Sequence, residues 1–415
     1  MTSSNTSTSL TPERIRRIVS ETPVLDIHTH IYDTNFGDLL FWGIDELLTY
    51  HYLVAEVYRV APMKYDTFWS MSKKKQADYI WHHLFIERSP ISEACRGILT
   101  CIRELGLDAS ERNLNKIRDY FKDMSPKKYI DIVFDKANVS SVIMTNDPFD
   151  DDERVIWERK IKRDKRFQAA LRIDQLLVNW GGSVDKLQSW CYEVEERLGP
   201  HTLAEIRRFL TDWIDTMAPR YLAASLPPSF RYPEDSACGR IIDECILPVT
   251  RDRNIPFAMM IGVKKLVNPD LWLAGDSVGK GDIESLERLC ASNSDNKFLV
   301  TMLSRENQHE LCVTARKFPN LMIFGCWWFL NNPSIIDEMT RERIELLGLS
   351  MIPQHSDARV LDQLIYKWKH SRRIIGDVLI DKYTDLAHAG WIVTEKEVVR
   401  DVKLLFGGVF DEFTS

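Results

Sequence analysis

Eight short apolar runs, spread along the chain, are the feature that most restricts how this sequence can fold. Each run favours a β-strand and is bounded by polar or turn-forming residues. Most are continuous rather than alternating, which is typical of parallel strands covered on both faces. The runs are Val24–Ile31, Val139–Asn146, Phe167–Asp174, Tyr221–Leu226, Ile255–Gly262, Lys297–Ser304, Leu321–Trp328 and Ser350–Asp357.

Helical patterns lie between these runs, and every gap is long enough for a crossover between parallel strands. Apolar residues recur at spacings of three and four over Leu203–Met217, Gln308–Lys317 and Ser334–Leu347. A strand and a helix that alternate eight times predict an α/β fold, the (β/α)8 or TIM barrel. We therefore expect residues 1–415 to form one barrel domain rather than two or three domains.

The gap after the first run, residues 32–138, is far too long for one crossover and is rich in helix formers and aromatic residues. It predicts a helical insertion in the first βα loop, at the barrel face where active sites form. The segment Leu271–Asp282 is expected to be a flexible covering loop, because its spacing departs from that of a phosphate loop. Residues 1–10 are expected to be a flexible tail, after which Thr11 caps a helix that begins at Pro12.

Composition excludes several classes of protein. The formal net charge is −7, from 54 Lys and Arg against 61 Asp and Glu, which argues against nucleic-acid binding. The longest apolar stretch, Leu321–Leu330, is too short to cross a bilayer as a helix. The eight cysteines are scattered without a C-x-x-C pair, and the N-terminus lacks the features of a signal peptide. These features predict a cytoplasmic protein with free thiols.

The first predicted strand ends in an H-x-H pair, His28 and His30. Side chains alternate along a strand, so both imidazoles point to the same side, which at this end of a barrel strand is the mouth. Two neutral imidazoles there provide half of a Zn, Mn or Fe site. The alternative is a pair of core histidines satisfied by hydrogen bonds.

Asp357 ends the eighth run, which adjoins the first strand in a closed barrel. Its carboxylate would be the third ligand, and such a site keeps positions open for water or substrate. The alternative is that Asp357 caps the helix that follows. His355 has the same parity along the strand, and would be an outer partner or an alternative ligand.

An H-x-H pair on the first strand and an Asp at the end of the eighth resemble the amidohydrolase superfamily. Hydrolases of that superfamily usually also carry a Lys or Glu on the fourth strand and a His on each of the fifth and sixth. The corresponding runs here, YLAASLPP, IPFAMMIG and KFLVTMLS, lack these ligands. A binuclear centre and ordinary hydrolysis are therefore not expected.

Five motifs in order resemble the uronate isomerase (glucuronate/galacturonate isomerase) family, in a divergent short subgroup. They are PVLDIHTHI, ELLTYHYLVAEVYR, LRID, GCWWFLNNP and HSDAR. The resemblance implies a distorted (β/α)8 barrel of the metal-dependent hydrolase type. It also implies aldose–ketose isomerisation of hexuronates, D-galacturonate to D-tagaturonate or D-glucuronate to D-fructuronate. One divalent ion would assist, Zn²⁺ in the first instance, with Mn²⁺ or Fe²⁺ as alternatives.

A uronate carries a carboxylate, which the planar fork of an arginine can hold in two parallel hydrogen bonds. Arg172 closes the third run and Arg359 follows Asp357 by two residues, so we expect both in the site, with surface ion pairing as the alternative. Trp327 and Trp328 end the seventh run with opposite parity. We expect Trp328 to line the sugar pocket.

His51 and Tyr52, on an insertion helix, match positions of the family's site, although an aromatic stripe packed on the barrel is the commoner use of such residues. The resemblance suggests that a metal on the two histidines and Asp357 binds the substrate carboxylate and a hydroxyl. Asp357 would move a proton during ring opening. Tyr52, helped by His51 or Arg359, would carry a proton between C1 and C2 through a cis-enediolate, and Asp357 and Tyr52 could exchange these roles.

Two rival functions remain open from the sequence. One is a mononuclear metal-dependent hydrolase of a small acidic amide or lactone, and the other is a non-catalytic barrel that binds sugar acids. As partners we expect a small hexuronate and a second copy of the chain in a homo-oligomer, but neither nucleic acid nor a membrane.

Overall fold

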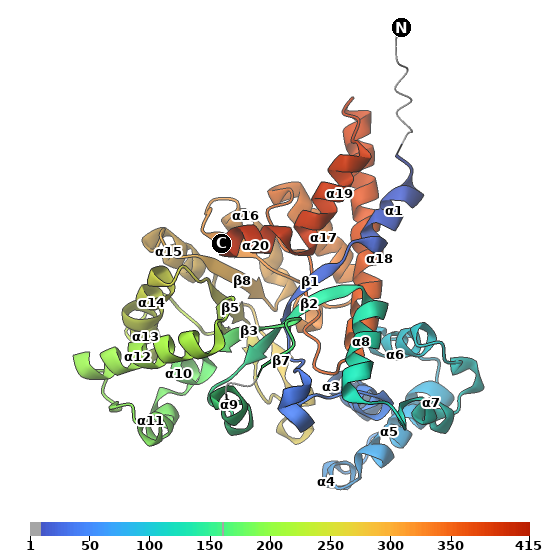
Figure 1. The fold of residues 1–415 in the computed structure, drawn as a ribbon, viewed down its shortest axis with the longest axis horizontal. Coiled ribbons are helices and arrows are strands. Elements are labelled where there is room, and N and C mark those ends of the chain that lie inside the picture. The colour runs from blue at the N-terminus through green and yellow to red at the C-terminus, as the bar shows by residue number, and fades with distance from the viewer. Residues whose placement is uncertain (1–9, 160–161) are drawn as a thin grey trace.

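Seven parallel strands form one curled sheet in the computed structural model, which describes residues 10–159 and 162–415 (Figure 1). The predicted tail, residues 1–10, lies outside this description except for its last residue. The strand order is β1-β2-β3-β4-β5-β8-β9, which confirms an α/β fold built on parallel strands. The strands are β1 (Val24–Thr29), β2 (Val139–Asn146), β3 (Phe167–Arg172), β4 (Leu222–Leu226), β5 (Phe257–Ile261), β8 (Phe298–Met302) and β9 (Leu321–Ile323).

The eighth predicted run does not form a regular strand, and that prediction is wrong. Its only bridge joins Ile352 to Phe324, and Asp357 has a φ of 49°, which a strand cannot continue. The segment nevertheless connects the two edges of the sheet. The amide of Gly325 donates to the carbonyl of Ile352 (2.8 Å), and the amide of Asp357 donates to that of His28 (3.1 Å).

Helices pack around the sheet, and the three helices predicted from apolar spacing are confirmed as α12, α16 and α17. Thr11 caps α1 as predicted, because its side chain accepts from the amide of Arg14 at 3.2 Å. The helices outside the first connection are α1 (Pro12–Glu21), α9 (Asp151–Glu158), α10 (Asp174–Val178), α11 (Trp180–Ser189), α12 (Pro200–Met217), α13 (Ala237–Ile241), α14 (Leu247–Asp252), α15 (Ile283–Ser292), α16 (Gln308–Ala315), α17 (Pro333–Leu347), α18 (Gln363–His388), α19 (Glu395–Lys403) and α20 (Val409–Thr414).

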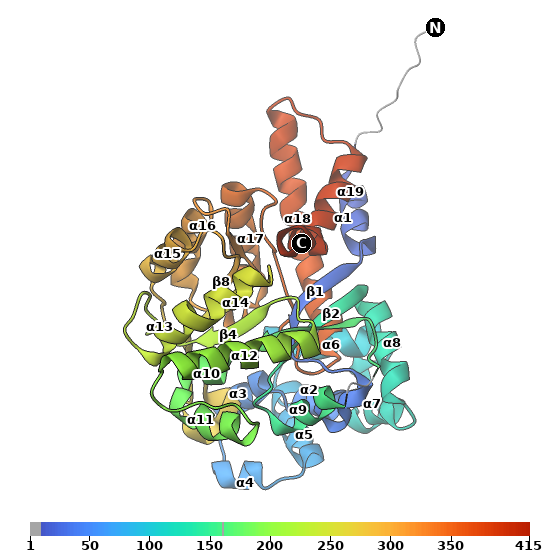
Figure 2. The same cartoon turned by 60° about the vertical axis from the view of Figure 1, so that its left-hand side comes forward.

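The long connection between β1 and β2 is helical. Its helices α3, α4 and α5 lie below the sheet in both views (Figures 1 and 2). The α-helices of this connection are α2 (Ile44–Leu48), α3 (His51–Val60), α4 (Tyr65–Trp69), α5 (Lys73–Trp81), α6 (Glu93–Glu104), α7 (Leu114–Phe121) and α8 (Pro126–Ala137). Short 3-10 turns and one π-helical segment, His82–Ile86, join them.

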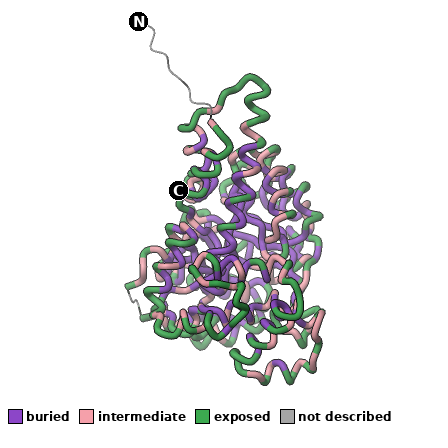
Figure 3. Tube along the Cα trace, turned by 90° about the vertical axis from the view of Figure 1, so that its right-hand side faces the viewer, coloured by how far each residue is buried: buried purple, intermediate pink, exposed green. Residues whose placement is uncertain are grey.

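The two faces of the sheet carry separate apolar cores. The inner face holds small and medium side chains, among them Ile143, Ala223 and Leu299. The outer face packs against the helices in a much larger cluster. In Figure 3 the buried residues fill the middle of the molecule, while the connection between α18 and α19 is exposed. None of the helices among the described residues is both long and apolar enough to span a membrane.

Candidate metal and substrate site

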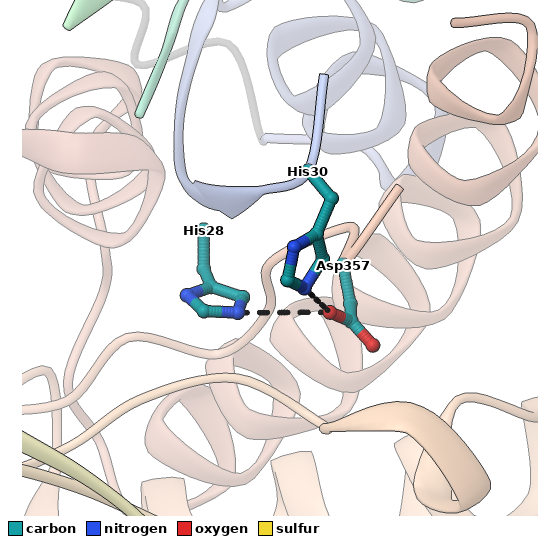
Figure 4. A group of neighbouring side chains, drawn as sticks. All are labelled: His28, His30 and Asp357. Carbon is teal, nitrogen blue, oxygen red and sulfur yellow. Dashed lines mark ion pairs between the residues drawn. The ribbon is translucent and has the colours of Figure 1, made fainter. Parts of the chain in front are cut away.

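His28, His30 and Asp357 converge at the carboxyl-terminal end of β1 (Figure 4). The Oδ1 atom of Asp357 lies 3.6 Å from Nε2 of His28 and 3.4 Å from Nε2 of His30. The side chain of His28 is fully buried and that of Asp357 nearly so. The structure therefore brings the three predicted ligands together in a water-poor place.

Hydrogen bonds on the far side of each ring decide which nitrogen carries the proton. The hydroxyl of Tyr221 donates to the carbonyl of Ile27 (2.7 Å) and lies 3.1 Å from Nδ1 of His28. The hydroxyl of Thr145 donates to a main-chain carbonyl and lies 2.9 Å from Nδ1 of His30. Each hydroxyl has used its proton, so each Nδ1–H donates to it. Both Nε2 atoms then present lone pairs to Asp357.

These atoms fit a divalent cation. Burial lowers the pKa of His28 to about 3 and that of His30 well below its usual value, so both rings are neutral. Three lone-pair atoms then face one another, and Nε2 of His28 is buried without a hydrogen-bond partner. Two ligands about 2.05 Å from a tetrahedral metal stand about 3.3 Å apart. The observed separations of 3.4 and 3.6 Å are close to that value.

A buried hydrogen-bond network holds Asp357 in a strained backbone conformation. Asp357 and Trp328 both have positive φ, 49° and 47°, which is uncommon outside glycine and more strained for a tryptophan than for an aspartate. Such strain is typical of functional sites, because the surrounding structure must enforce it. Here the carboxylate of Asp26 accepts from the amide of Ser356 (3.0 Å) and from the indole of Trp368 (2.8 Å). The turn that presents Asp357 is therefore tied to β1.

One cavity of ≈ 60 Å³ adjoins the three ligands. All predicted site residues except Tyr52 lie on its wall. The structure adds residues that sequence reasoning missed: Tyr50, Ser225, Met260, Lys265, Leu273 and Trp327. They come from segments far apart in the chain, and no local pattern marks them as a group.

Tyr52 lies behind the wall rather than on it. Its hydroxyl is buried without a hydrogen-bond partner, and burial raises its pKa well above the usual value. The ammonium group of Lys367, another residue that the sequence did not single out, lies 5.8 Å from the centre of the Tyr52 ring. The ring of Tyr50 takes the position on the wall that we expected for Tyr52.

His51 reaches the cavity from the start of α3 and packs edge-on against Trp328, with ring centres 5.5 Å apart. Burial lowers its pKa to about 3, and its Nε2 atom has no partner. The parity argument for Trp327 and Trp328 is wrong, because β9 ends at Ile323 and both indoles line the cavity. The prediction that Trp328 lines it agrees with this placement.

Two guanidinium groups face the cavity, one paired with a carboxylate and the other without a side-chain partner among the described residues. Arg172 is bound bidentately by Asp174, with N–O distances of 2.9 and 3.1 Å, so its orientation is fixed. The guanidinium of Arg359 has no ion pair or hydrogen bond to any residue that the structure describes. One arginine is preorganised and the other is available for an anionic ligand.

His355 lies beside the metal ligands without joining them. Its ring centre is 5.1 Å from that of His28, and both of its nitrogens are buried without partners. A Cβ atom on Gly325 would stand 1.8 Å from its Nδ1 atom. Gly325 has a φ of 67°, so glycine is needed there both for its conformation and for its small size.

The predicted covering loop does lie over the cavity. Its main part is the 3-10 segment Pro269–Gly275, followed by β7 (Ser277–Val278), which pairs antiparallel with β6 (Val263–Lys264). Trp272 stacks on Trp69 of α4, with ring centres 4.1 Å apart. The loop is therefore fastened to the helical connection that follows β1.

Comparison with known proteins places this geometry in a family. No protein-family model and no curated protein sequence matches the chain. Several solved structures do match its fold. A uronate isomerase from Bacillus halodurans shares 57% sequence identity, with a TM-score of 0.96 over 97% of this chain and 96% of that one. A uronate isomerase from Thermotoga maritima is 16% identical, with a TM-score of 0.79 over 97% of each chain.

A glucuronate isomerase from Caulobacter crescentus is 14% identical, with a TM-score of 0.76 over 99% of this chain and 95% of that one. The two distant structures show that the fold is shared. The Bacillus halodurans enzyme is similar enough in sequence, over almost the full length of both chains, to decide the family. This chain belongs to the uronate isomerase family.

Proposed function

We propose that this isomerase interconverts a hexuronate between its aldose and ketose forms, D-glucuronate with D-fructuronate or D-galacturonate with D-tagaturonate. The observation that carries the proposal is one buried cavity that joins a His₂Asp ligand set to two guanidinium groups. A hexuronate needs both, because it offers a carboxylate to bind and hydroxyl groups to polarise. The Bacillus halodurans relative is itself described as a uronate isomerase.

The site would hold one divalent ion, with His28, His30 and Asp357 as its ligands. Bound there, the ion would supply positive charge for the substrate oxygens and would lower the pKa of a hydroxyl group. Zn²⁺ is our first expectation, and Mn²⁺ and Fe²⁺ suit the same ligands. Strands β4, β5 and β8 contribute no further His or carboxylate, which supports one ion rather than two.

Substrate binding rests on Arg172 and Arg359. We infer that Arg359, which has no protein partner, receives the carboxylate in a bidentate pair. Arg172, whose orientation Asp174 fixes, would offer a second guanidinium group at the cavity wall. His51 and Trp328 would pack against the sugar chain and exclude water from it.

Two proton transfers are required. Asp357 would accept or return the proton that moves when the sugar ring opens. Tyr52 lies behind the cavity wall, so it would move the proton from C2 to C1, through a cis-enediolate, only once the cavity has enlarged, while His51, assisted by the positive charge of Arg359, moves a proton between the two oxygens. Burial and the neighbouring Tyr50 and Asp357 oppose ionisation of Tyr52, whereas the Lys367 ammonium, 5.8 Å from the centre of its ring, would favour it.

The cavity must enlarge for turnover. Small-molecule sites usually have volumes of about 300–1,000 Å³, whereas this cavity measures ≈ 60 Å³. The loop that carries Leu273 is the part of the wall most open to solvent. We propose that this loop lifts when the substrate enters and closes again during the reaction.

We further propose that residues 350–358 take the place of the eighth strand and close a distorted (β/α)8 barrel. The hydrogen bonds from Gly325 to Ile352 and from Asp357 to His28 support this closure. The chain would then be a single domain over residues 1–415, with residues 32–138 inserted over the site. A cytoplasmic homo-oligomer remains our expectation, and all eight cysteines are free thiols.

The test is to assay D-glucuronate against D-galacturonate by NMR, with metal content measured on the same sample. Formation of a ketouronate at about one metal per chain is the expected result. If neither sugar acid reacts but a lactone or amide is hydrolysed, the rival hydrolase function is correct. If a sugar acid binds without turnover in the metal-loaded protein, the chain is a binding protein.

A further inference from the structure

A second concave region lies at the other end of the sheet. It is a cleft of ≈ 580 Å³ between α1, α6, the end of α8 and the middle of α18. Asn138, on its wall, immediately precedes β2, whereas His30 of the candidate site follows the last residue of β1. Helix α18 packs against α1, α6 and α8 (Figures 1 and 2). The cleft is thus separate from the cavity and has a volume suited to a small molecule.

Basic side chains dominate this cleft. Seven of its thirteen lining residues are lysine or arginine, another is His370, and none is Asp or Glu. The whole chain has a formal net charge of −7. The cleft is therefore a local reversal of charge in an acidic protein, and such a region attracts anions.

Nearby carboxylates neutralise only part of this charge. Three of them form ion pairs with lining residues: Asp377 with Arg16 at 3.1 Å, Glu93 with Arg96 at 3.0 Å, and Glu104 with both Arg103 at 2.7 Å and Lys369 at 3.3 Å. Three carboxylates against seven cations leave an excess of four positive charges. The side chains of all four paired cations are at least 44% exposed, so the pairs can open to receive a ligand.

The remaining three cations have no carboxylate partner among the described residues. Lys136 and Arg373 are exposed, and their side chains make no hydrogen bond or ion pair there. Arg372 is only 7% exposed and donates to the main-chain carbonyls of Val19, Thr22 and Asn138. Its Nε atom is buried without any partner. The cleft thus has one buried cation whose position is fixed and two exposed cations without a carboxylate partner in the described part of the chain.

We propose that this cleft binds a small phosphate-bearing molecule, of the size of a nucleotide or a sugar bisphosphate. Guanidinium groups hold phosphate oxygens bidentately, and a group that carries two or more negative charges matches the excess better than a single carboxylate does. The limited volume of the cleft, ≈ 580 Å³, favours a small molecule over a nucleic acid. This inference is independent of the function proposed for the cavity.

The test is calorimetric titration of the full chain with pyrophosphate, ATP and fructose 1,6-bisphosphate at about 0.1 M NaCl, where charges are screened beyond about 10 Å. The test variant is K136Q/R373Q. The matched control is K127Q/K128Q, which removes the same charge from exposed positions at the other end of α8. We expect binding that weakens about tenfold or more in the test variant, as expected for two lost charged contacts, and stays unchanged in the control.

The relative affinities for the three ligands identify the class of phosphate compound that the cleft binds. Tightest binding of ATP would identify a nucleotide site, tightest binding of the bisphosphate a sugar-phosphate site, and equal affinities a site that recognises phosphate alone. The proposal is overturned if none of the three binds to the wild type, if both double variants lose affinity equally, or if only an oligonucleotide binds. Cooperative thermal unfolding of both variants shows that each is folded.

Discussion

The two halves of the sheet differ sharply in chemistry. Strands β1 to β3 and the segment 350–359 supply the polar half of the site, with its candidate metal ligands, its arginines and the Thr145 hydroxyl beside His30. The hydroxyl beside His28 comes from Tyr221, just before β4. Strands β4, β5 and β8 contain no ionisable residue and give the cavity only Ser225 and Met260. The polar half can therefore perform chemistry on bound oxygens, while the apolar half shapes the space. The predictions below test this division.

Removal of the shared ligand should have the largest effect. In D357N the amide can neither carry the ring-opening proton nor provide a charged ligand, so we expect activity to fall about 1,000-fold or more and metal content to fall with it. The control is D38N, the same change at an exposed carboxylate. Steady-state kinetics and metal analysis measure both. Full activity and full metal occupancy in D357N would contradict the role of this residue.

The polar half should also make stability depend on pH. Burial raises the pKa of Glu153, which is 4% exposed and accepts from Tyr32, to about 7 from 4.5. The folded state then binds this proton more tightly than the unfolded chain. The resulting stability is complete below pH 4.5 and is lost as the pH rises through about 7, by at most about 3 kcal/mol.

E153Q removes this titration. Urea denaturation at pH 4.5 and pH 7.5 should therefore show the wild type losing stability relative to E153Q as the pH rises. Any constant offset from the altered hydrogen bonds cancels in this comparison. Parallel pH profiles for the two proteins would show that the Glu153 carboxyl group titrates normally.

R359Q tests the carboxylate contact. A lost charge-assisted pair costs about 1.5–3 kcal/mol, so kcat/KM should fall about 10- to 100-fold, mainly through KM, with metal content unchanged. The control is R59Q, at an exposed arginine on α3. Equal kinetics in R359Q and R59Q would place the substrate carboxylate elsewhere.

W272A tests the contact that joins the two halves, since the loop after β5 stacks on the connection after β1. An aromatic pair contributes about 0.5–1.5 kcal/mol, so loosening the closed state should lower kcat/KM about fivefold. W391A, at an indole that is 62% exposed near the end of α18, is the control. Identical kinetics in the two variants would mean that the stack plays no part in closure.

M260L should have the smallest effect. The side chain keeps its volume and its apolar character, so activity should stay within about threefold of the wild type. A loss as large as that of R359Q would show that the apolar half makes a specific contact with the reacting atoms. The division between the halves would then fail.

The sequence singled out the three candidate ligands because strand alternation is a local rule. His28 lies in β1 and His30 directly follows it, and the structure brings both together with Asp357. The prediction that Asp357 ends a β-strand was nevertheless wrong, because Asp357 has a left-handed backbone conformation. A hydrogen bond from the amide of Asp357 to the carbonyl of His28, rather than strand pairing, holds Asp357 beside β1.

Contacts between distant segments could not be predicted in this way. Tyr221 and Thr145 orient the imidazoles from other strands, and nothing in their local sequence indicates it. The wall position of Tyr50 depends on where α3 begins relative to the barrel mouth. A few of the missed residues had a local signal: Asp174 follows Arg172 by two residues, Tyr50 adjoins His51 and Trp327 adjoins Trp328.

The central claim is that the cavity moves a proton between adjacent carbons of a hexuronate. Its most direct test is incubation of the metal-loaded enzyme with D-glucuronate and with D-galacturonate in deuterated water, followed by NMR. We expect a ketouronate that carries solvent deuterium on C1, or deuterium on C2 of the recovered aldose. No ketouronate from either substrate, with no deuterium on C2 of the recovered aldose, would contradict the account.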